Sequence, residues 1–262
     1  MATLTALHSY PLKSAGGTSL RGAELIATGL RDDREFMLAT PEGRHLSQRE
    51  CAAMARLRPV REPVRDGVLS VRFDDAEPLV HTPVDGGPAA RVTVHGNPCL
   101  GVDQGDAAAA WFARALGRPC RLVRFTGHRA TAHGGGEVAF ADGYPLLLIS
   151  EESLEDLNGR LDAPLPMDRF RPNLVVRGLG AYGEDKVRLL RIGGTEIELV
   201  KPCARCVITT TDQETGERGR EPLRTLARYR NIDRGLLFGQ NAVPRVTGPL
   251  AVGDDVEVLA HR

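Results

Sequence analysis

The chain has 262 residues, a formal net charge of zero, 42% hydrophobic residues and 26% charged residues. This composition is typical of a soluble globular protein of one large or two small domains, and it offers no overall charge that would favour nucleic acid or a membrane surface. Residues 1–14 lack the basic end and apolar core of a signal peptide, and no run of about eighteen apolar residues follows. We therefore expect a cytoplasmic protein without a membrane-spanning helix.

The cysteine content bears on the same question. The cysteines are odd in number and scattered except for one close pair: Cys51, Cys99, Cys120, Cys203 and Cys206. Secreted disulfide scaffolds carry dense, even sets of cysteines, whereas free thiols persist in a reducing compartment. The pattern therefore argues against a disulfide scaffold and fits the cytoplasm.

Residues 1–100 predict a series of short strands. Apolar segments alternate with Gly, Pro and Asp, which is typical of a β-barrel or sandwich, and the expected strands lie at 4–12, 23–30, 34–40, 44–49, 67–73 and 91–96. A helix is then expected over 106–117, with Asp106 as its cap and Gly117 as its end. Because the pattern changes from all-β to mixed near 103–120, we divide the chain into domains 1–115 and 116–262.

The rest of the chain predicts strands mixed with short helices. A helix over 150–161 is expected to begin at Ser150 as N-cap and to end at Gly159. A further helix is expected over 222–230, and the chain closes with a predicted hairpin over 249–259. The remaining strands are expected at 121–125, 145–149, 173–178, 186–194, 196–202 and 238–248. The predicted fold class is therefore mainly β with a few helices (α+β).

Cys203 and Cys206 form a Cys-x-x-Cys pair that precedes five β-branched residues, Val207–Thr211. A structural zinc site needs four ligands, and the sequence offers no second such pair and no ligand-spaced histidines. A thioredoxin-type pair lies at a helix N-terminus, whereas β-branched residues favour strand. Two inert, buried cysteines remain a third interpretation.

Lys201 and Arg205 beside the pair favour a different use of the sulfur. Nearby cations stabilise a thiolate over a thiol. A thiolate is a soft ligand for a metal centre. One cysteine could therefore hold a metal whose other ligands come from an anionic organic cofactor.

The stretch CARCVITTTDQETG (203–216) resembles the signature of MOSC-domain proteins, in the group similar to the mitochondrial amidoxime reducing component and its bacterial relatives. The resemblance spans nearly the whole chain and implies a MOSC N-terminal β-barrel domain packed on a β-barrel MOSC domain. Further matching motifs follow the family order: YPLKS (10–14), GLRDDREFML (29–38), ADGYPLLLISEESLEDLN (141–158), FRPNLVV (170–176), EPLRTLARYR (221–230), LFGQN (237–241) and VGDDVEVL (252–259).

The resemblance implies a molybdenum–pyranopterin (molybdopterin) cofactor whose metal is bound by Cys206, while Cys203 would be structural. Arg forks and a Lys point charge suit an anionic phosphate and dithiolene, and amide or hydroxyl groups suit pterin edges. By position in the motifs, the cofactor-binding residues would be Lys13, Ser14, Arg34, Tyr144, Arg171, Asn173, Arg205, Cys206 and Asn241. The family is also described in general terms as binding pyridoxal phosphate, and we assign no residue of this chain to such binding.

The sequence departs from some relatives at three places. Gly143-Tyr144 stands where they carry small hydroxylated residues, so that a contact there would use backbone or the Tyr hydroxyl. Asn241 replaces an aromatic residue. The stretch 183–187 lacks a Trp, which puts the substrate range in doubt if this stretch lines the substrate entrance.

The implied activity is reduction of N-hydroxylated compounds (amidoximes, hydroxylamines and N-hydroxylated bases). Asp185 and Asp212 are the candidate acids. Because the chain has no four-cysteine cluster for an iron–sulfur centre, electrons would come from a separate donor: a ferredoxin, a haem protein or a flavin reductase. Two alternatives remain, a non-catalytic cofactor carrier or sulfur-handling module and a metal-free binding domain.

Overall fold

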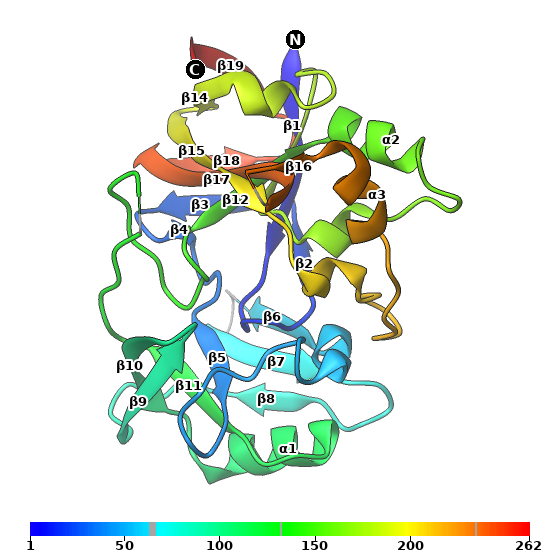
Figure 1. The fold of residues 1–262 in the computed structure, drawn as a ribbon. Helices are drawn as coiled ribbons and strands as arrows, with labels where there is room; N and C mark the ends of the chain where they lie inside the picture. Colours follow the sequence, from blue (N-terminus) through cyan, green and yellow to red (C-terminus); the bar gives the residue numbers. More distant parts are fainter. Residues whose placement is uncertain (63–66, 132, 234) are drawn as a thin grey trace.

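The structure is a computed structural model that describes residues 1–62, 67–131, 133–233 and 235–262. Strands dominate, and the α-helices among these residues are α1 (Asp106–Leu116), α2 (Glu151–Asn158) and α3 (Leu223–Tyr229). Figure 1 shows a barrel in the upper half, and smaller sheets with α1 in the lower half. The predicted mainly-β fold with a few helices is confirmed. No helix in the described ranges has the length and apolar content needed to span a bilayer.

The upper half contains a closed barrel. The strand order is β12–β13–β1–β19–β14–β15–β17, and β17 pairs again with β12, which closes a ring of seven strands. The β12–β13 pair is parallel, and the other pairs of the ring are antiparallel. Closure removes the free edges of the sheet. The strands are β1 (Ala2–Ser9), β12 (Leu146–Ser150), β13 (Leu174–Arg177), β14 (Val187–Ile192), β15 (Thr195–Ala204), β17 (Gly235–Val246) and β19 (Asp255–His261).

Aliphatic side chains form the barrel core. Leu4 and Leu7 of β1 are fully buried there, together with Leu148 and Ile197. An odd spacing such as 4 and 7 would place two side chains on opposite faces of a regular strand. The register of β1 against β13 shifts between Leu4 and Ala6, and this bulge allows both leucines to share one core.

The lower half contains two smaller sheets, β5–β11–β10–β9 and β6–β7–β8, with Trp111 and Phe112 of α1 in its core. Short strands β2 and β16 extend β1 and β17, and β18–β3–β4 form a separate sheet. The bounds are β2 (Thr18–Leu20), β3 (Gly22–Ile26), β4 (Gly29–Leu30), β5 (Phe36–Ala39), β6 (Arg58–Glu62), β7 (Val68–Arg72), β8 (Leu79–His81), β9 (Ala89–Val94), β10 (Asn97–Asp103), β11 (Arg121–Phe125), β16 (Asn231–Ile232) and β18 (Gly248–Ala251). The 3₁₀-helices are η1 (Ala52–Arg56), η3 (Met167–Phe170), η4 (Gly183–Lys186) and η5 (Val207–Thr210).

The strand predicted over Val207–Thr211 is wrong, because Val207–Thr210 form η5 and Thr211 forms only an isolated bridge. The Thr209 hydroxyl donates to the carbonyl of Cys206 (2.9 Å), and the Thr210 hydroxyl donates to that of Val207 (2.8 Å). These hydroxyl-to-backbone hydrogen bonds stabilise a helical turn in place of the backbone pairing of a β-sheet. Here they outweigh the preference of β-branched residues for strands.

Three other local predictions are corrected. Residues 249–259 do not form a hairpin: β18 pairs with β3, and β19 pairs with β1 and β14, because these partners complete the barrel and its flanking sheet. Residues 44–49 form isolated bridges rather than a strand. Gly105, not Asp106, is the N-cap of α1, and its N–H is bound by the carboxylate of Asp103 (2.8 Å). Ser150 is confirmed as the cap of α2.

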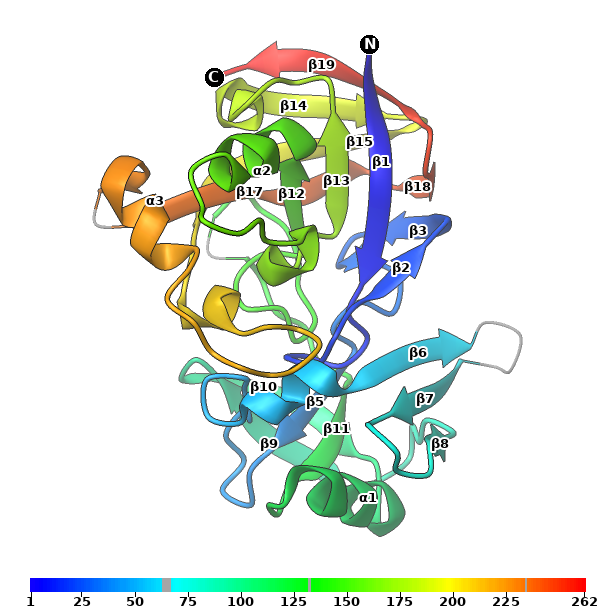
Figure 2. The ribbon, with the colours of Figure 1, turned by 90° about the vertical axis from the view of Figure 1, so that its right-hand side faces the viewer.

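Strand pairing crosses the predicted division at residues 115/116. Strand β1 lies in the barrel, between β13 and β19, whereas β11 pairs with β5 in the lower half. In Figure 2, β1 runs down from the N-terminus at the top toward the junction of the two halves. Residues 10–17 and 31–35 therefore lie where the halves meet, although the division 1–115/116–262 itself stays a prediction.

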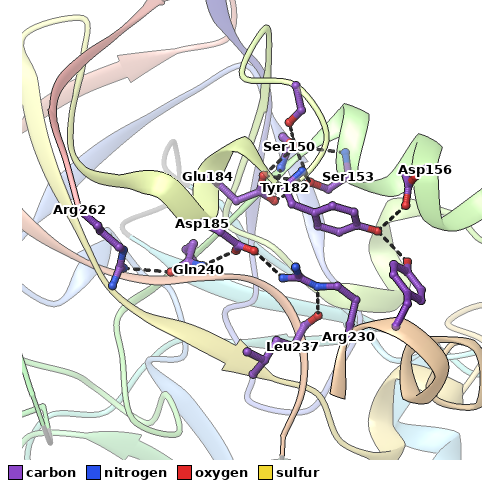
Figure 3. Close-up of polar contacts among 12 residues, drawn as sticks. Ser150, Ser153, Asp156, Tyr182, Glu184, Asp185, Arg230, Leu237, Gln240 and Arg262 are labelled. Carbon is purple, nitrogen blue, oxygen red and sulfur yellow. Dashed lines mark hydrogen bonds and ion pairs between the residues drawn. The ribbon is translucent and has the colours of Figure 1, made fainter. Parts of the chain in front are cut away.

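A buried polar cluster joins α2 to η4 (Figure 3). Glu184 is fully buried, and it accepts hydrogen bonds from the backbone N–H of Ser150 (3.2 Å) and from the hydroxyls of Ser150 and Ser153 (2.9 and 2.8 Å). Burial raises the pKa of Glu184 above its usual range, against the effect of these donors. The carboxyl group therefore anchors the N-terminus of α2 while resisting ionisation.

We expect Glu184→Ala to lower the free energy of unfolding by about 2–4 kcal/mol, because it leaves several buried donors without a partner. Chemical denaturation at neutral pH measures this, and wild-type stability in the variant would contradict the assignment. Glu184→Gln is the matched control. Since the pKa is raised in the folded state, the stabilisation by Glu184 is complete below the unfolded pKa and declines as pH rises through the folded pKa, so that the advantage of wild type over Glu184→Gln shrinks with rising pH.

Candidate functional site

The predicted site residues converge on one cavity. It has a volume of about 180 Å³ and lies beside the segments that join the two halves. All nine predicted residues line it: Lys13, Ser14, Arg34, Tyr144, Arg171, Asn173, Arg205, Cys206 and Asn241. Their roles remain predictions. The fold brings these nine residues together from segments that are far apart in the sequence.

Three of these residues have a left-handed backbone. The φ angles are +65° at Ser14, +48° at Arg34 and +57° at Arg171. Residues other than glycine rarely adopt this region, and such strain concentrates at functional sites. The backbone of Arg34 is fixed by its N–H, which donates to the carbonyl of Tyr10 (2.8 Å). This hydrogen bond holds the left-handed backbone of Arg34 in place and thereby fixes the direction in which its side chain leaves the chain.

Tyr10 organises two of the cations. The guanidinium carbons of Arg34 and Arg171 lie 4.5 and 4.3 Å from the centroid of its ring. The ring is buried, and its hydroxyl donates to the carbonyl of Pro172 (3.1 Å). Burial raises the pKa of Tyr10 to about 12 despite the two cations, and burial lowers the pKa of Arg171 to about 10. Tyr10 therefore stays neutral and offers a π face to both guanidinium groups.

Asn173 is fully engaged within the protein. Its Oδ1 accepts from Arg34 Nη1 (3.0 Å) and from the N–H of Leu147 (3.2 Å), and its Nδ2 donates to the carbonyl of His8 (3.2 Å). The side chain is therefore held rigidly and orients Arg34, which also pairs with the buried carboxylate of Asp33. Arg171 lacks a carboxylate partner among its described contacts and donates to the Ala15 carbonyl (2.5 Å) and Gln213 Oε1 (3.3 Å).

Lys13 is buried and forms an ion pair with Asp142, which also lines the cavity. Burial lowers the pKa of Lys13, although the carboxylate opposes this shift. Desolvation disfavours ionisation of Asp142, but Lys13 and His95 hold the pKa of this carboxyl well below its usual range. The pair is therefore an ammonium facing an ionised carboxylate at the cavity wall.

The two cysteines have different partners. Arg49 Nη2 donates to the sulfur of Cys206 (3.3 Å), whereas Arg205 Nη1 donates to that of Cys203 (2.9 Å). Arg205 Nη2 also binds the carbonyl of Phe170 (2.6 Å). The cation in contact with the sulfur of Cys206 is therefore Arg49 rather than Arg205.

Lys201, the other cation expected beside the cysteines, is exposed and does not line the cavity. Its side chain leaves β15 on the solvent side, since strand residues alternate between faces. Among the described residues, no three His, Cys, Asp or Glu side chains converge to hold a metal ion by themselves.

The candidate acids lie outside the cavity lining. Asp185 binds Arg230 Nη2 and Gln240 Nε2, each at 2.6 Å (Figure 3). Asp212 accepts the backbone N–H groups of Thr215 and Glu214 in a turn, and chiefly the first of these contacts lowers its pKa to about 2. The stretch 183–187 forms η4 and the first residue of β14, and none of its residues lines the cavity.

Sequence reasoning missed Asp142, which lines the cavity, and three residues that contact its lining: Tyr10, Arg49 and His95. Tyr10 and Asp142 belong to matched motifs, YPLKS and ADGYP, which could have suggested them. Arg49 and His95 lie in segments without a recognised motif and come from the lower half of the molecule. Only the folded structure brings them into contact with residues that line the cavity, Cys206 and Asp142.

A larger cavity of about 520 Å³ lies beside α1 and Trp111, and none of the predicted residues lines it. We regard the smaller cavity as the candidate site because thiol, cationic and amide groups converge there. Two of its lining residues carry unused donors: Tyr144 Oη and Arg205 Nε are buried without a hydrogen-bond partner. Buried polar atoms are rarely left unpaired, so these groups and the surplus of cations fit an anionic, polar cofactor.

Comparisons with protein families agree with this arrangement. Residues 1–119 match the model of the MOSC N-terminal beta barrel domain, and residues 135–257 match the MOSC domain. Mitochondrial amidoxime-reducing component 1 of Mus musculus is 35% identical over 286 residues, which cover 100% of this chain and 83% of that protein. The Homo sapiens protein of the same name is 33% identical over 284 residues, covering 100% and 84%.

A molybdenum cofactor sulfurase of Arabidopsis thaliana is 32% identical over 264 residues, which cover 90% of this chain and 32% of that longer protein. The similarity therefore extends over both predicted domains in proteins of different overall length. Because full-length relatives exceed 30% identity and both domain models match in order, the chain belongs to the MOSC-domain family, in the group related to the mitochondrial amidoxime-reducing components.

Proposed function

We propose that the protein is a molybdenum-cofactor-dependent oxidoreductase that reduces N-hydroxylated compounds, with a cytoplasmic location. The observation that carries the proposal is the convergence of two cysteine thiols, Cys203 and Cys206, and four cationic side chains on a single cavity. Amidoxime-reducing relatives with 35% and 33% identity over the whole chain support it.

The charge distribution supports an anionic occupant. Of the lining cations, Lys13 and Arg34 have carboxylate partners, whereas Arg171 and Arg205 contact carbonyls, an amide and a thiol in the described part of the chain. Buried cations without counter-charge are costly. A phosphate and a dithiolene would supply that counter-charge, and guanidinium forks match them geometrically.

The residues have distinct proposed roles. Lys13, Arg34, Arg171 and Arg205 would hold the anionic groups, and Cys206 would bind molybdenum. The orphaned hydroxyl of Tyr144 and the side chains of Ser14 and Asn241 would hydrogen-bond the pterin, while Asn173 positions Arg34. When bound, the cofactor would supply the two-electron chemistry that cleaves the N–O bond. Arg49 would orient the ligating sulfur and withdraw electron density from it.

The electrons would come from a separate donor protein, a ferredoxin, a haem protein or a flavin reductase, since the chain carries no four-cysteine cluster.

A second candidate function is favoured by the similarity to the molybdenum cofactor sulfurase. In that case the protein would bind the cofactor as a carrier or sulfur-handling module without reducing substrates.

We expect Cys206→Ser to lose molybdenum, because a hydroxyl is a poor substitute for a soft thiolate. Cys203→Ser is the matched control: Cys203 lines the same cavity but its sulfur accepts from Arg205, and because the ligand role is assigned to Cys206 alone this variant should retain molybdenum. Element analysis of both proteins from a host that makes the cofactor measures this. Molybdenum retained at the wild-type level in Cys206→Ser would refute the ligand assignment.

We expect Arg49→Met to reduce metal retention or turnover by roughly 10–100-fold, as is typical when a partner of a metal ligand is lost. Arg49→Lys keeps the charge but not the planar fork, and it should recover part of the loss. Molybdenum content and steady-state kinetics of both variants give the measurement. Equal molybdenum content and equal turnover in wild type and Arg49→Met would show that the contact of Arg49 with Cys206 contributes to neither.

The two candidate functions are separated by turnover of the loaded protein. With an aromatic amidoxime as substrate and a reduced viologen as electron source, we expect formation of the amidine at a rate proportional to molybdenum content. A protein that binds molybdenum but forms no amidine would support the carrier function. A wild-type protein free of molybdenum would overturn both.

A further inference from the structure

A buried histidine, His45, lies directly behind the wall of the candidate site. Its Nε2 lies 3.2 Å from the hydroxyl oxygen of Ser14, which lines the cavity, whereas His45 itself does not line it. Among the described contacts of this imidazole, the hydrogen bond to Ser14 is the one that satisfies a ring nitrogen. A buried polar side chain needs such a partner, and here the partner belongs to the site.

The backbone of His45 is fixed independently of Ser14. Its N–H donates to the carbonyl of Thr93 in β9 (3.0 Å), and His45 forms an isolated antiparallel bridge with Ala39 of β5. The N–H of the next residue, Leu46, donates to the carbonyl of Leu38, also in β5 (2.8 Å). These bonds hold His45 between two strands of the lower half, so that its imidazole meets Ser14 from a rigid support.

A second side chain of the same segment holds Ser14. Gln48 Nε2 donates to the carbonyl of Ser14 (2.9 Å), and Gln48 does not line the cavity either. Ser14 has a left-handed φ angle of +65°, and such a backbone persists where the surroundings fix it. The carbonyl and the hydroxyl of Ser14 are thus each bound by a side chain from residues 45–48. These two contacts determine how the hydroxyl lies in the cavity wall.

The imidazole of His45 is neutral. Burial, followed by repulsion from Lys13, lowers the pKa of His45 to about 3. A neutral imidazole has one N–H and one acceptor nitrogen, and a serine hydroxyl has one hydrogen. The tautomer of His45 therefore decides whether Ser14 spends its hydrogen on Nε2 or keeps it for another acceptor.

We propose that His45 is a positioning residue that keeps Ser14 as a hydrogen-bond donor toward the bound cofactor, an inference that rests on the proposed cofactor binding. With a hydrogen on Nε2, His45 donates to the oxygen of Ser14. The hydroxyl hydrogen of Ser14 is then left for an acceptor atom of the anionic occupant that the cationic cavity fits. The opposite tautomer would commit this hydrogen to His45 and leave only lone pairs for the occupant.

The first test uses two amide side chains that imitate different nitrogens of His45. A Gln side chain brings its amide N–H close to the position of Nε2, whereas the shorter Asn imitates Nδ1 and does not reach Ser14. Calorimetric titration of the cofactor-free protein with metal-free molybdopterin, without oxygen, measures Kd. We expect His45→Asn to raise Kd about tenfold and His45→Gln to stay within about threefold of wild type, because only Gln keeps Ser14 oriented before binding.

A double-mutant cycle separates positioning from packing. We expect Ser14→Ala to raise Kd for molybdopterin at least about tenfold, since a donor to a charged group is lost. In the Ser14→Ala background, His45→Asn should then have no further effect, because the hydroxyl through which His45 acts is gone. If His45→Asn weakens binding as much in this background as in wild type, His45 acts through packing alone and the positioning role is wrong.

A third measurement needs no substitution and stands even if His45→Asn does not fold. In protein labelled with ¹⁵N-histidine, the NMR shifts of the two ring nitrogens distinguish the tautomers of His45. We expect the Nε2–H tautomer in the complex with metal-free molybdopterin at neutral pH. The Nδ1–H tautomer in that complex would overturn the inference, because Nε2 would then take the hydrogen of Ser14.

The outcomes distinguish the inference from the function on which it rests. If loaded wild type reduces amidoximes while His45→Asn binds molybdopterin as tightly as wild type, the positioning role is refuted and the reductase function stands. If wild type binds molybdopterin with the expected tautomer and cycle but shows no turnover once loaded, the reductase function fails and the role of His45 in cofactor binding stands. If wild type does not bind molybdopterin, both fail.

Discussion

The candidate site depends on stacking two guanidinium groups on one buried phenol ring. The like charges of Arg34 and Arg171 repel each other, and the Tyr10 ring that both contact offsets this repulsion. The ring provides a π face to both cations, and its own hydroxyl is fixed on the carbonyl of Pro172, so the cluster keeps one arrangement. This arrangement holds positive charge at the cavity wall before any anion arrives, which is the condition for binding at low reorganisation cost.

A second layer of contacts ties the lower half to the cysteine loop. The side-chain amides of Gln48 and Gln213 exchange two hydrogen bonds (3.2 and 3.3 Å), and Gln48 also donates to the carbonyl of Ser14 (2.9 Å). Arg218 adds a donor to the carbonyls of Gln48 and Arg49. Because Arg49 reaches Cys206 from this segment, the environment of the sulfur depends on how the two halves are docked, and not on the cysteine loop alone.

The sequence predicted much of the fold and nine of the residues that line the cavity. It could do so because these residues belong to short motifs, such as YPLKS and FRPN, that can be recognised in the sequence alone. Local propensity failed where side chains bond to nearby backbone, as in the threonines of η5, or where a distant strand offers better pairing, as for β19. Contacts such as Arg49 with Cys206 and His95 with Asp142 join residues far apart in sequence. They follow from tertiary packing, which no single-segment pattern encodes.

The pairing of β1 has a consequence for the order of assembly. Ala2 and Thr3 lie opposite Val256 and Asp255, so β1 lacks one of its neighbours until residues 255–256 have been made. Such long-range pairing slows folding because a large loop must close first. The lower end of β1 leads directly to Lys13 and Ser14, so the full pairing of the strand that precedes these cavity residues requires β19 to be present. Loading of a prosthetic group would accordingly follow the docking of β19 against β1.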